Sequence, residues 1–428
     1  MSGSRIFLLV CLVLIIGILI GLVLKTSRFF ESELLGLEGR VIEIEGGVIK
    51  QEENKFVLEK GRENVLIFSS QIFDYGDKLK VIGKIEKPPV FDDFDYKGYL
   101  ERKRIFVLVY QPEIEKISEK KFSIYKSVLN LRKNLAEAID KSYSIEQANI
   151  LKAMVLGIKT EISDNLKDRL NRSGIRHLTA ISGMHTIILI NALMFLFLGA
   201  GLWRKQAFFL TLIFILFFVT ITGFQPSTIR ASIMASLLLL AQVVGRMNNP
   251  TRAIVLSALI MLLLNPFLLF DIGFQLSFLA VMGINYLFPI FRFWLRKIPK
   301  TLGLKSILIM TLSAQLFTLP ILIYNFGYVS LIAPITNLLI LPTLPFILIF
   351  GAISAILALF SHSLALILIF PCYILLSYLL KITNIFSSFA FSSIHLSFPW
   401  IFVIIFYSFL FYFVYNWRKE HRFKILGF

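Results

Sequence analysis

The residues best suited to chemistry in this chain lie in the stretch 171–191, NRSGIRHLTAISGMHTIILIN. His177, Ser182 and His185 stand there, where a strongly apolar segment begins. On a helix, Ser182 and His185 would be three residues apart on one face, with His177 within about a quarter turn of His185. Polar groups inside a bilayer are costly unless they pair or face water, so these side chains mark a candidate functional site.

Four interpretations of this site are open. The side chains could line the mouth of a wet pore, and Gly183 would permit a close backbone approach there. Ser182 and His185 could instead be the nucleophile and base of an intramembrane serine hydrolase. Two histidines without a nearby carboxylate or thiol are poor zinc ligands, so we expect neither a metal nor a cofactor. The last interpretation is that the side chains only satisfy one another and the helix backbone.

A second polar group lies in GFQPSTIRASIMA, residues 223–235. A glycine and a proline should end the preceding span there, and Ser227 is predicted to N-cap the next helix. Gln225 and Arg230 are candidate pore-lining residues of this group.

Asp271, in LLFDIGFQLSF, is the only carboxylate within the predicted core spans and is expected at the same depth as Arg230. A lone buried charge costs several kcal/mol. We therefore expect Asp271 and Arg230 to pair or to share a wet vestibule. Gln275 is a further candidate channel-lining residue. Alternatively, Arg230 extends its charge to the membrane surface.

A third polar group accompanies a run of prolines in residues 313–345. Pro320, Pro334, Pro342 and Pro345 should break helices there and free backbone carbonyls that must face protein or water. Broken helices near the membrane centre form binding sites in many transporters, and Gln315 and Asn337 are the candidates here. Simple kinks for packing are the alternative.

Composition places these segments in a membrane. The chain has 428 residues, of which 57% are hydrophobic and 42 are phenylalanine, far outside the usage of soluble proteins. About ten spans are predicted if 329–360 is one broken span. They are a retained anchor in 1–27 and segments near 178–200, 206–223, 227–245, 253–269, 273–291, 305–325, 329–360, 363–380 and 397–416. Cys11 and Cys372 both lie in apolar segments, so a disulfide is not expected.

Residues 36–112 have a different character, because short alternating runs are separated by Gly, Asn and Asp. This pattern predicts a small OB-like β-barrel, a fold often used to bind single strands. Its aromatic residues could stack bases, although such residues are more often core: Phe56, Phe68, Phe73 and Tyr75. Arg102, Lys103 and Arg104 are candidate phosphate contacts, with a solvated charged face as the alternative.

The predicted organisation is therefore an anchor in 1–27, an OB-like domain in 32–118, amphipathic interfacial helices in 119–175, a polytopic domain in 176–416 and a basic tail in 417–428. The formal net charge is +17, and the basic excess lies in the membrane part. Positive residues gather in alternate loops, which predicts cytoplasmic N- and C-termini and an extracytoplasmic barrel. The same charges could attract a polyanion.

Several segments together, in order and across nearly the whole chain, resemble the ComEC-type competence protein family. They are FDYKGYL (94–100), RHLTAISGMH (176–185), GFQPSTIRASIMA (223–235), and the segments 263–284 and 314–342. The positions that match the family motifs are His177, Ser182, Gly183, His185, Arg230, Gly273, Gln275, Ser277, Pro320 and Asn337.

The resemblance implies a multi-pass protein of the bacterial plasma membrane that passes single-stranded DNA inward during natural transformation, and that is not an enzyme. It also implies an external DNA receptor and a cytoplasmic translocase ATPase as partners. Many members carry a metallo-β-lactamase-like domain, but the five histidines here form no HxHxDH-like cluster. We therefore expect this chain to lack that nuclease activity and to depend on a separate nuclease. An intramembrane serine hydrolase and a transporter of another solute remain the rival functions.

Overall fold

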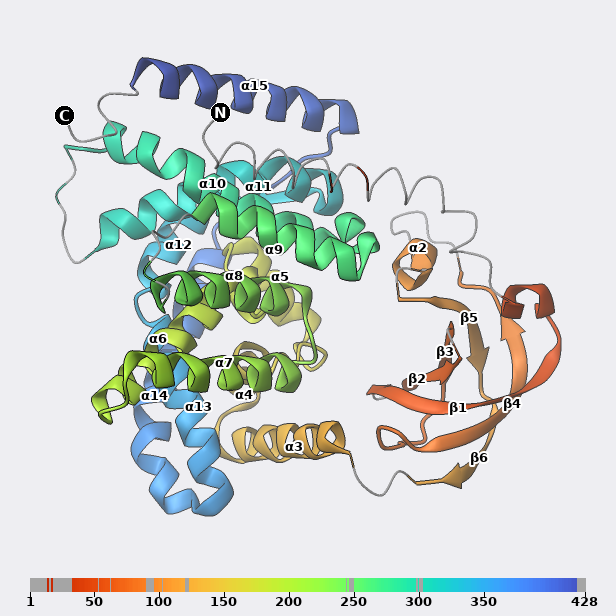
Figure 1. Cartoon of the computed structure of the whole chain (residues 1–428). Helices are drawn as coiled ribbons and strands as arrows, with labels where there is room; N and C mark the ends of the chain where they lie inside the picture. Colours follow the sequence, from red (N-terminus) through yellow and green to blue (C-terminus); the bar gives the residue numbers. More distant parts are fainter. Residues whose placement is uncertain are drawn as a thin grey trace. The chain divides into compact units, whose positions relative to one another are not determined.

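The computed structural model describes residues 33–52, 54–61, 63–89, 96–101, 103–119, 123–243, 250–297 and 303–421, with Leu14, Gly17, Gly245 and Pro299. The chain divides into two compact units, a β-rich unit that ends at Leu131 and a helical unit that begins at Arg132 (Figure 1). The helical unit lacks the short segment Asn265–Leu268, which is grouped with the β-rich unit. Most of the anchor expected in 1–27 lies outside the described residues.

The β-rich unit begins with a short 3-10 helix, η1 (Glu33–Leu37), and its six strands form one sheet that closes on itself. The strands are β1 (Val41–Glu52), β2 (Lys55–Lys60), β3 (Glu63–Phe68), β4 (Lys78–Glu86), β5 (Ile105–Tyr110) and β6 (Glu113–Ser118). The order is β1-β2-β3-β5-β4, and β4 pairs again with β1 to close a five-stranded ring, while β6 adds to β4. Only the β3–β5 pair is parallel. The closed ring confirms the predicted OB-like barrel.

Strand β1 is long enough to serve both neighbours in the ring. Its first half pairs with β4 and its second half with β2, and a register shift lies between Val48 and Lys50. At Gly46, a Cβ would lie 2.4 Å from the carbonyl oxygen of Glu59. A glycine is therefore needed at the point where the strand bends from one partner to the other.

The barrel interior contains the alternating apolar residues of each strand, and Phe56 is fully buried among them. Phe56 is therefore a core residue, which corrects the suggestion that it could stack bases. Phe73 packs edge-on against it, with ring centroids 5.2 Å apart. Phe68 stacks on Tyr110 at 4.6 Å instead, so one face of each of these rings is already covered.

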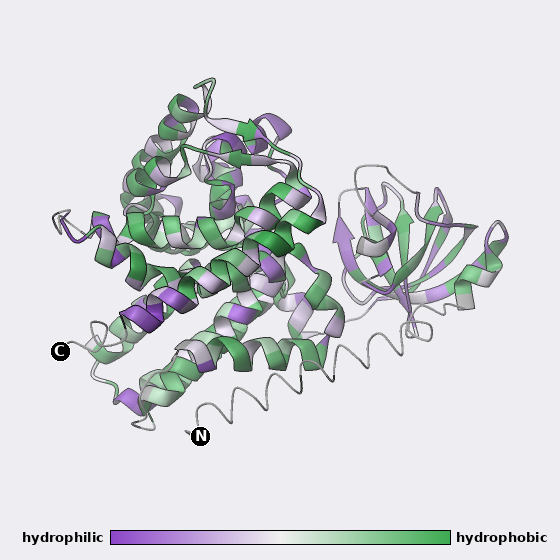
Figure 2. Ribbon diagram, turned by 90° about the horizontal axis from the view of Figure 1, so that it is seen from above, coloured by the Kyte–Doolittle hydropathy of each residue, from purple (hydrophilic) through white to green (hydrophobic). Residues whose placement is uncertain are grey.

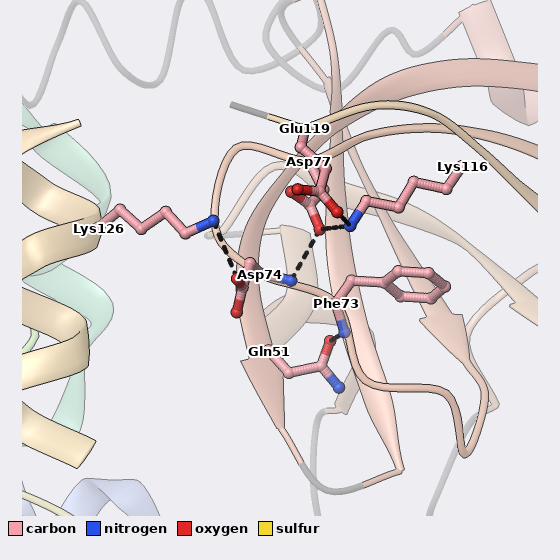
Figure 3. Close-up of polar contacts among 7 residues, drawn as sticks. All are labelled: Gln51, Phe73, Asp74, Asp77, Lys116, Glu119 and Lys126. Atoms are coloured by element: carbon pink, nitrogen blue, oxygen red, sulfur yellow. Dashed lines mark hydrogen bonds and ion pairs between the residues drawn. The ribbon is translucent and has the colours of Figure 1, made fainter. Parts of the chain in front are cut away.

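Charged residues fix the loop between β3 and β4 (Figure 3). Asp77 is 1% exposed, and its Oδ2 accepts the backbone N–H of Asp74 at 3.1 Å and pairs with Lys116 Nζ at 2.9 Å. Asp74 in turn pairs with Lys126, in the first turn of α3, at 2.9 Å. A buried carboxylate must be paired, so this loop has one preferred conformation.

The rest of the chain is helical. After α2 (Tyr96–Glu101), the helices are α3 (Ile124–Ser142), α4 (Ile145–Val155), α5 (Asp164–Arg172), η2 (Arg176–Thr179), α6 (Gly183–Gly199), α7 (Arg204–Ile221), α8 (Pro226–Val243), α9 (Pro250–Leu264), η3 (Pro266–Phe270), α10 (Ile272–Trp294), α11 (Leu304–Phe326), α12 (Ala333–Ile340), α13 (Leu344–Phe360), α14 (His362–Ser387) and α15 (Trp400–Glu420). A two-stranded sheet joins β7 (Tyr328–Ser330) to β8 (Ser393–His395).

Five of these helices are long and apolar enough to cross a membrane: α7, α10, α11, α14 and α15. The bent pair α12 and α13, with a 53° break, adds a sixth, and α6, α8 and α9 are shorter apolar helices. Hydrophobic residues dominate the helical unit in Figure 2, and large apolar side chains such as Phe195 and Phe411 point outward. The protein is thus a multi-pass membrane protein, while the count of ten spans stays a prediction.

Two local features differ from the sequence-based expectation. Pro320 lies inside α11 without ending it. A neighbouring helix contacts the same turn, where the Tyr407 hydroxyl donates to the Phe317 carbonyl at 2.8 Å. In the region predicted to be interfacial, α4 is not amphipathic, since residues 147–154 are all buried. It is a core helix that packs against α13 and α14.

Candidate functional site

The start of α6 brings Ser182 and His185 together, but by a different geometry from the one expected. The helix begins at Gly183, so Ser182 is the extended residue before it, and His177 belongs to the separate turn η2. Ser182 Oγ lies 2.9 Å from His185 Nδ1, and the Ser182 backbone N–H also donates to Nδ1 at 3.2 Å. The histidine therefore closes back over the helix start and caps it.

This pair has the distance of a nucleophile and a base but lacks the rest of a catalytic arrangement. His185 is 2% exposed, and its Nε2 has no hydrogen-bond partner among the described residues. No carboxylate of the described residues is paired with this imidazole, as the third member of a Ser-His-Asp triad would be. His177, by contrast, is exposed. In the described part of the chain, no three His, Cys, Asp or Glu side chains come together in a way that could hold a metal ion.

The corner between α7 and α8 is tied to the start of α6. Gly223 and Phe224 both adopt positive φ angles, of 76° and 53°, and α8 then begins at Pro226. Ser227 lies within that helix and does not N-cap it, contrary to the prediction. Its hydroxyl donates to the Ile181 carbonyl at 2.6 Å, because the extended residues before α6 have no helical partner for that group.

Gln225 joins the same corner to the loop after α4. Its Nε2 donates to the Gly157 carbonyl at 3.0 Å, whereas its Oε1 is buried without a partner among the described residues. Gly157 has a φ of 72°, and a Cβ there would lie 2.5 Å from Gln225 Nε2. The glycine therefore permits both the turn and the contact.

The expected pair of Arg230 and Asp271 does not form. Asp271 Oδ1 accepts the Phe274 backbone N–H at 2.7 Å, so Asp271 is the N-cap of α10. Arg230 is 4% exposed, with its guanidinium carbon 5.6 Å from the centre of the Phe278 ring on that helix. Phe278 lies seven residues beyond Asp271, or about 10 Å further along α10. Such low exposure also contradicts the alternative in which Arg230 reaches the membrane surface.

Asp271 has a different cation within electrostatic range, Lys159 in the loop between α4 and α5. Burial lowers the pKa of Lys159, the neighbouring Arg176 lowers it further, and Asp271 acts in the opposite direction. Gln275, one turn into α10, donates from Nε2 to the Leu269 carbonyl at 2.9 Å and so secures the turn before the helix.

The polar residues at the starts of α6 and α8 form one cluster, and the Pro-rich region forms a second. The second cluster is hydrogen-bonded to the segment just before η2. Gln315 Nε2 donates to the Ser330 carbonyl at 3.1 Å, and the Ser330 hydroxyl donates to the Arg172 carbonyl at 2.8 Å. Thr336, the residue before Asn337, donates its hydroxyl to the Ser173 carbonyl at 2.6 Å. Segment 172–185 therefore lies between the two clusters, tied to β7 and α12 at one end and to α8 at the other.

Three amide oxygens in these clusters are buried without a hydrogen-bond donor among the described residues: those of Gln225, Gln315 and Asn337. Buried polar atoms are almost always satisfied, by water where protein offers no partner. Because all three lie in the helical unit, the interior of this unit is suited to hold water.

A family model described as "Competence protein" matches residues 154–420. The chain belongs to the competence protein family. It is also similar to ComE operon protein 3 of Bacillus subtilis (strain 168), at 33% identity over 287 residues, which cover 66% of this chain and 36% of that protein. The chain thus spans about a third of the length of this curated relative. No solved structure matches it.

The region matched by the family model contains both polar clusters and leaves out the barrel. The barrel carries the basic candidates, and Arg102 lies outside the described residues. Lys103 and Arg104 are exposed in the turn between α2 and β5, where Arg104 has a φ of 58°. A role of these two residues in phosphate binding stays a prediction.

One buried charged group was missed at the sequence level. Lys152 on α4 is 2% exposed and pairs with Asp140 of α3 at 2.5 Å and with Glu161 of the following loop. A lysine in the otherwise apolar run ILKAMVLG was the available signal. Its two partners could not be identified from spacing alone.

Proposed function

We propose that this chain conducts one strand of DNA into the cell during natural transformation, as the membrane channel of the competence family to which it belongs. The observation that carries the proposal is the pair of polar clusters around segment 172–185, inside the region matched by the family model. They contain a buried arginine without a carboxylate partner and three unsatisfied amide oxygens among the described residues. Such groups persist in a membrane protein where water or a substrate reaches them.

The proposed orientation follows the charge of the loops. N- and C-termini in the cytoplasm would place the OB-like barrel outside and the basic loops around Arg204 and Arg292 inside. The starts of α6, α8 and α10 would then lie together toward the outer surface. In this orientation the candidate residues are at the outer end of the path, where a strand would enter.

A conducting path should hold a polyanion weakly at several places, because one dense cluster of cations would trap the strand. Conduction also needs a driving force, and we propose a cytoplasmic translocase ATPase for it. An external receptor that delivers DNA and a nuclease that removes the complementary strand complete the proposed set of partners. In this proposal the chain itself is not an enzyme.

The test is uptake of labelled duplex DNA by cells from which the gene has been deleted. We expect the nuclease-resistant intracellular label and the yield of transformants to fall to background, and both to return when the gene is restored. Unchanged uptake in the deletion strain would refute the proposal. Surface-bound label serves as the control, because a channel acts after binding and the bound fraction should not fall.

A second candidate function, intramembrane hydrolysis, is favoured by the distance of 2.9 Å between Ser182 Oγ and His185 Nδ1. The replacement Ser182→Ala separates the two functions. A hydrolase would lose essentially all activity, whereas a channel in which Ser182 caps a helix should keep uptake within severalfold. Ser182→Thr, which keeps the hydroxyl, is the matched control. Complete loss with Ala and full recovery with Thr, at equal protein level, would favour the hydrolase.

A further inference from the structure

Arg230 carries a charge in a place where no described side chain balances it. It is 4% exposed, its Nε has no partner, and its nearest described contacts are the Met234 sulfur, 3.5 Å from Nη1, and the face of Phe278. A thioether and an aromatic ring attract a cation only weakly and carry no net charge. A buried arginine is normally paired with an anion.

The guanidinium also lies against the start of α6. A Cβ on Gly183, the first residue of that helix, would be 3.3 Å from Nη2 and 3.9 Å from Nη1. The backbone N–H groups of Gly183 and Met184 make no hydrogen bond to the described residues. The free amides and the dipole of this 17-residue helix add positive potential at the point where the guanidinium lies.

Two positive groups that meet inside a membrane protein repel each other unless an anion joins them. A tetrahedral phosphate matches both, because guanidinium groups bind phosphate oxygens through two parallel hydrogen bonds and helix starts bind them through backbone amides. The absence of a side chain at Gly183 leaves the backbone open to such a ligand.

We propose that Arg230 and the first turn of α6 form a binding site for one phosphate group, occupied during uptake by a phosphodiester of the moving strand. The inference rests on the proposed function and adds to it the atoms that hold the strand. A single diester carries one negative charge, which balances the guanidinium. The ligand is then held at one place and released as the next phosphate arrives.

The motif residues of this region differ in exposure. Arg230 is buried, Ser182 and Gly183 are half-buried, and His177 is exposed. Ser182 and His185 close over the same helix start. The start of α6 beside the guanidinium is therefore partly accessible, while the arginine itself is buried.

The site is tested by uptake in cells and by binding to purified protein in nanodiscs, with a short fluorescein-labelled oligothymidylate as the probe. Arg230→Gln should lower both uptake and affinity about tenfold, the size of one charge-assisted hydrogen bond. Arg230→Lys should lose less, because it keeps the charge without the paired donors. Gly183→Ala, with the arginine intact, should also weaken binding, since its methyl group enters the site.

Arg418→Gln is the matched control. Arg418 is also packed on an aromatic face, 4.6 Å from the centre of the Tyr286 ring, but lies on α15 far along the chain from α6. This variant should bind and take up DNA within twofold of wild type. If Arg230→Gln and Gly183→Ala both behave as wild type at equal protein level, the site does not exist as proposed.

Three further arms separate the sources of phosphate. Competition by inorganic phosphate should follow the same order of variants as the labelled strand, and an uncharged methylphosphonate strand should not compete. Binding that depends on Arg230 only when phosphatidylglycerol is added to phosphatidylcholine nanodiscs would assign the site to a lipid headgroup and overturn the strand assignment. If deleting the gene leaves uptake intact, the proposed function itself fails. If deletion abolishes uptake but Arg230→Gln and Gly183→Ala both bind and take up DNA like wild type, this inference alone fails.

Discussion

The helical unit contains two buried cations in opposite circumstances. Lys152, on the core helix α4, pairs with both Asp140 and Glu161, whereas Arg230, on α8, has no carboxylate partner among the described residues. Both side chains are at least 95% buried, so burial alone does not explain the difference. The first charge is balanced by protein carboxylates, and the second has no carboxylate partner among the described residues.

The same contrast extends to their surroundings. Around Lys152, the buried polar groups of α4 have protein partners: Asn149 Nδ2 donates to the Glu161 carbonyl at 2.8 Å. Around the starts of α6 and α8, the described structure leaves His185 Nε2, Arg230 Nε and Gln225 Oε1 without partners. The charge on Lys152 is thus balanced by protein carboxylates, whereas the polar atoms left without described partners at the starts of α6 and α8 could be satisfied by a substrate or by water.

The largest expected effect comes from leaving Lys152 buried without a carboxylate partner, as Arg230 is. The double replacement Asp140→Asn and Glu161→Gln leaves the lysine buried without a countercharge, and we expect a loss of about 3–5 kcal/mol in the free energy of unfolding. Thermal unfolding in detergent measures it. Adding Lys152→Met should recover part of the loss, because the uncompensated charge is removed. A double variant as stable as wild type would show that the pairing does not stabilise the fold.

The turn at Gly174, between α5 and η2, should be nearly as sensitive to substitution. Gly174 has a φ of 75°, and a Cβ there would lie 2.3 Å from the Ala333 Cβ. Gly174→Ala should cost about 2–4 kcal/mol, because it combines a left-handed backbone with overpacking. Gly201→Ala is the control: its φ is 84° but nothing lies within 4 Å, so only the backbone cost of about 1 kcal/mol remains. Equal losses in the two variants would contradict the close packing of α12 on this turn.

A smaller effect is expected at Asp271, which caps a helix instead of pairing with Arg230. Asp271→Ala should cost about 1 kcal/mol, and Asp271→Asn much less, since asparagine caps equally well. In a double-mutant cycle with Arg230→Met, the coupling energy should stay below about 0.5 kcal/mol. A larger coupling would mean that the two charges interact and that the comparison with Lys152 is wrong.

The sequence alone predicted most of the elements but few of the contacts. Period-two alternation identified the barrel, because each strand buries every second residue. Apolar length located the helices from α6 to α15, although α14 continues to Ser387, beyond the end predicted near residue 380. The prediction that Arg230 pairs with Asp271 was wrong, because the depth of each residue in the membrane was inferred from the predicted helix boundaries. The boundary at Asp271 is the cap itself, while Arg230 packs further along α10 beside Phe278.

The candidate site was predicted as a set of residues, and its assignment as a functional site stays a prediction. Its internal geometry could not be obtained from spacing. Ser182 and His185 meet only because α6 begins between them, and the bond between Thr336 and Ser173 joins residues 163 positions apart. Such contacts depend on how helices pack, which hydrophobic periodicity does not specify.

The smallest effect on stability is expected from replacing Arg230, although its deep burial alone would suggest a large one. Arg230→Met removes a charge that no described carboxylate balances and keeps most of the side-chain volume, so the free energy of unfolding should change by less than about 1 kcal/mol. Lys152→Met, the same change at an equally buried cation, should cost more, because it leaves Asp140 and Glu161 to repel each other. Comparing the two by thermal unfolding, with DNA uptake measured in parallel, separates a structural charge from a functional one. If Arg230→Met unfolds as readily as Lys152→Met, then Arg230 is held by partners that stabilise the fold, and its availability to a phosphate is refuted.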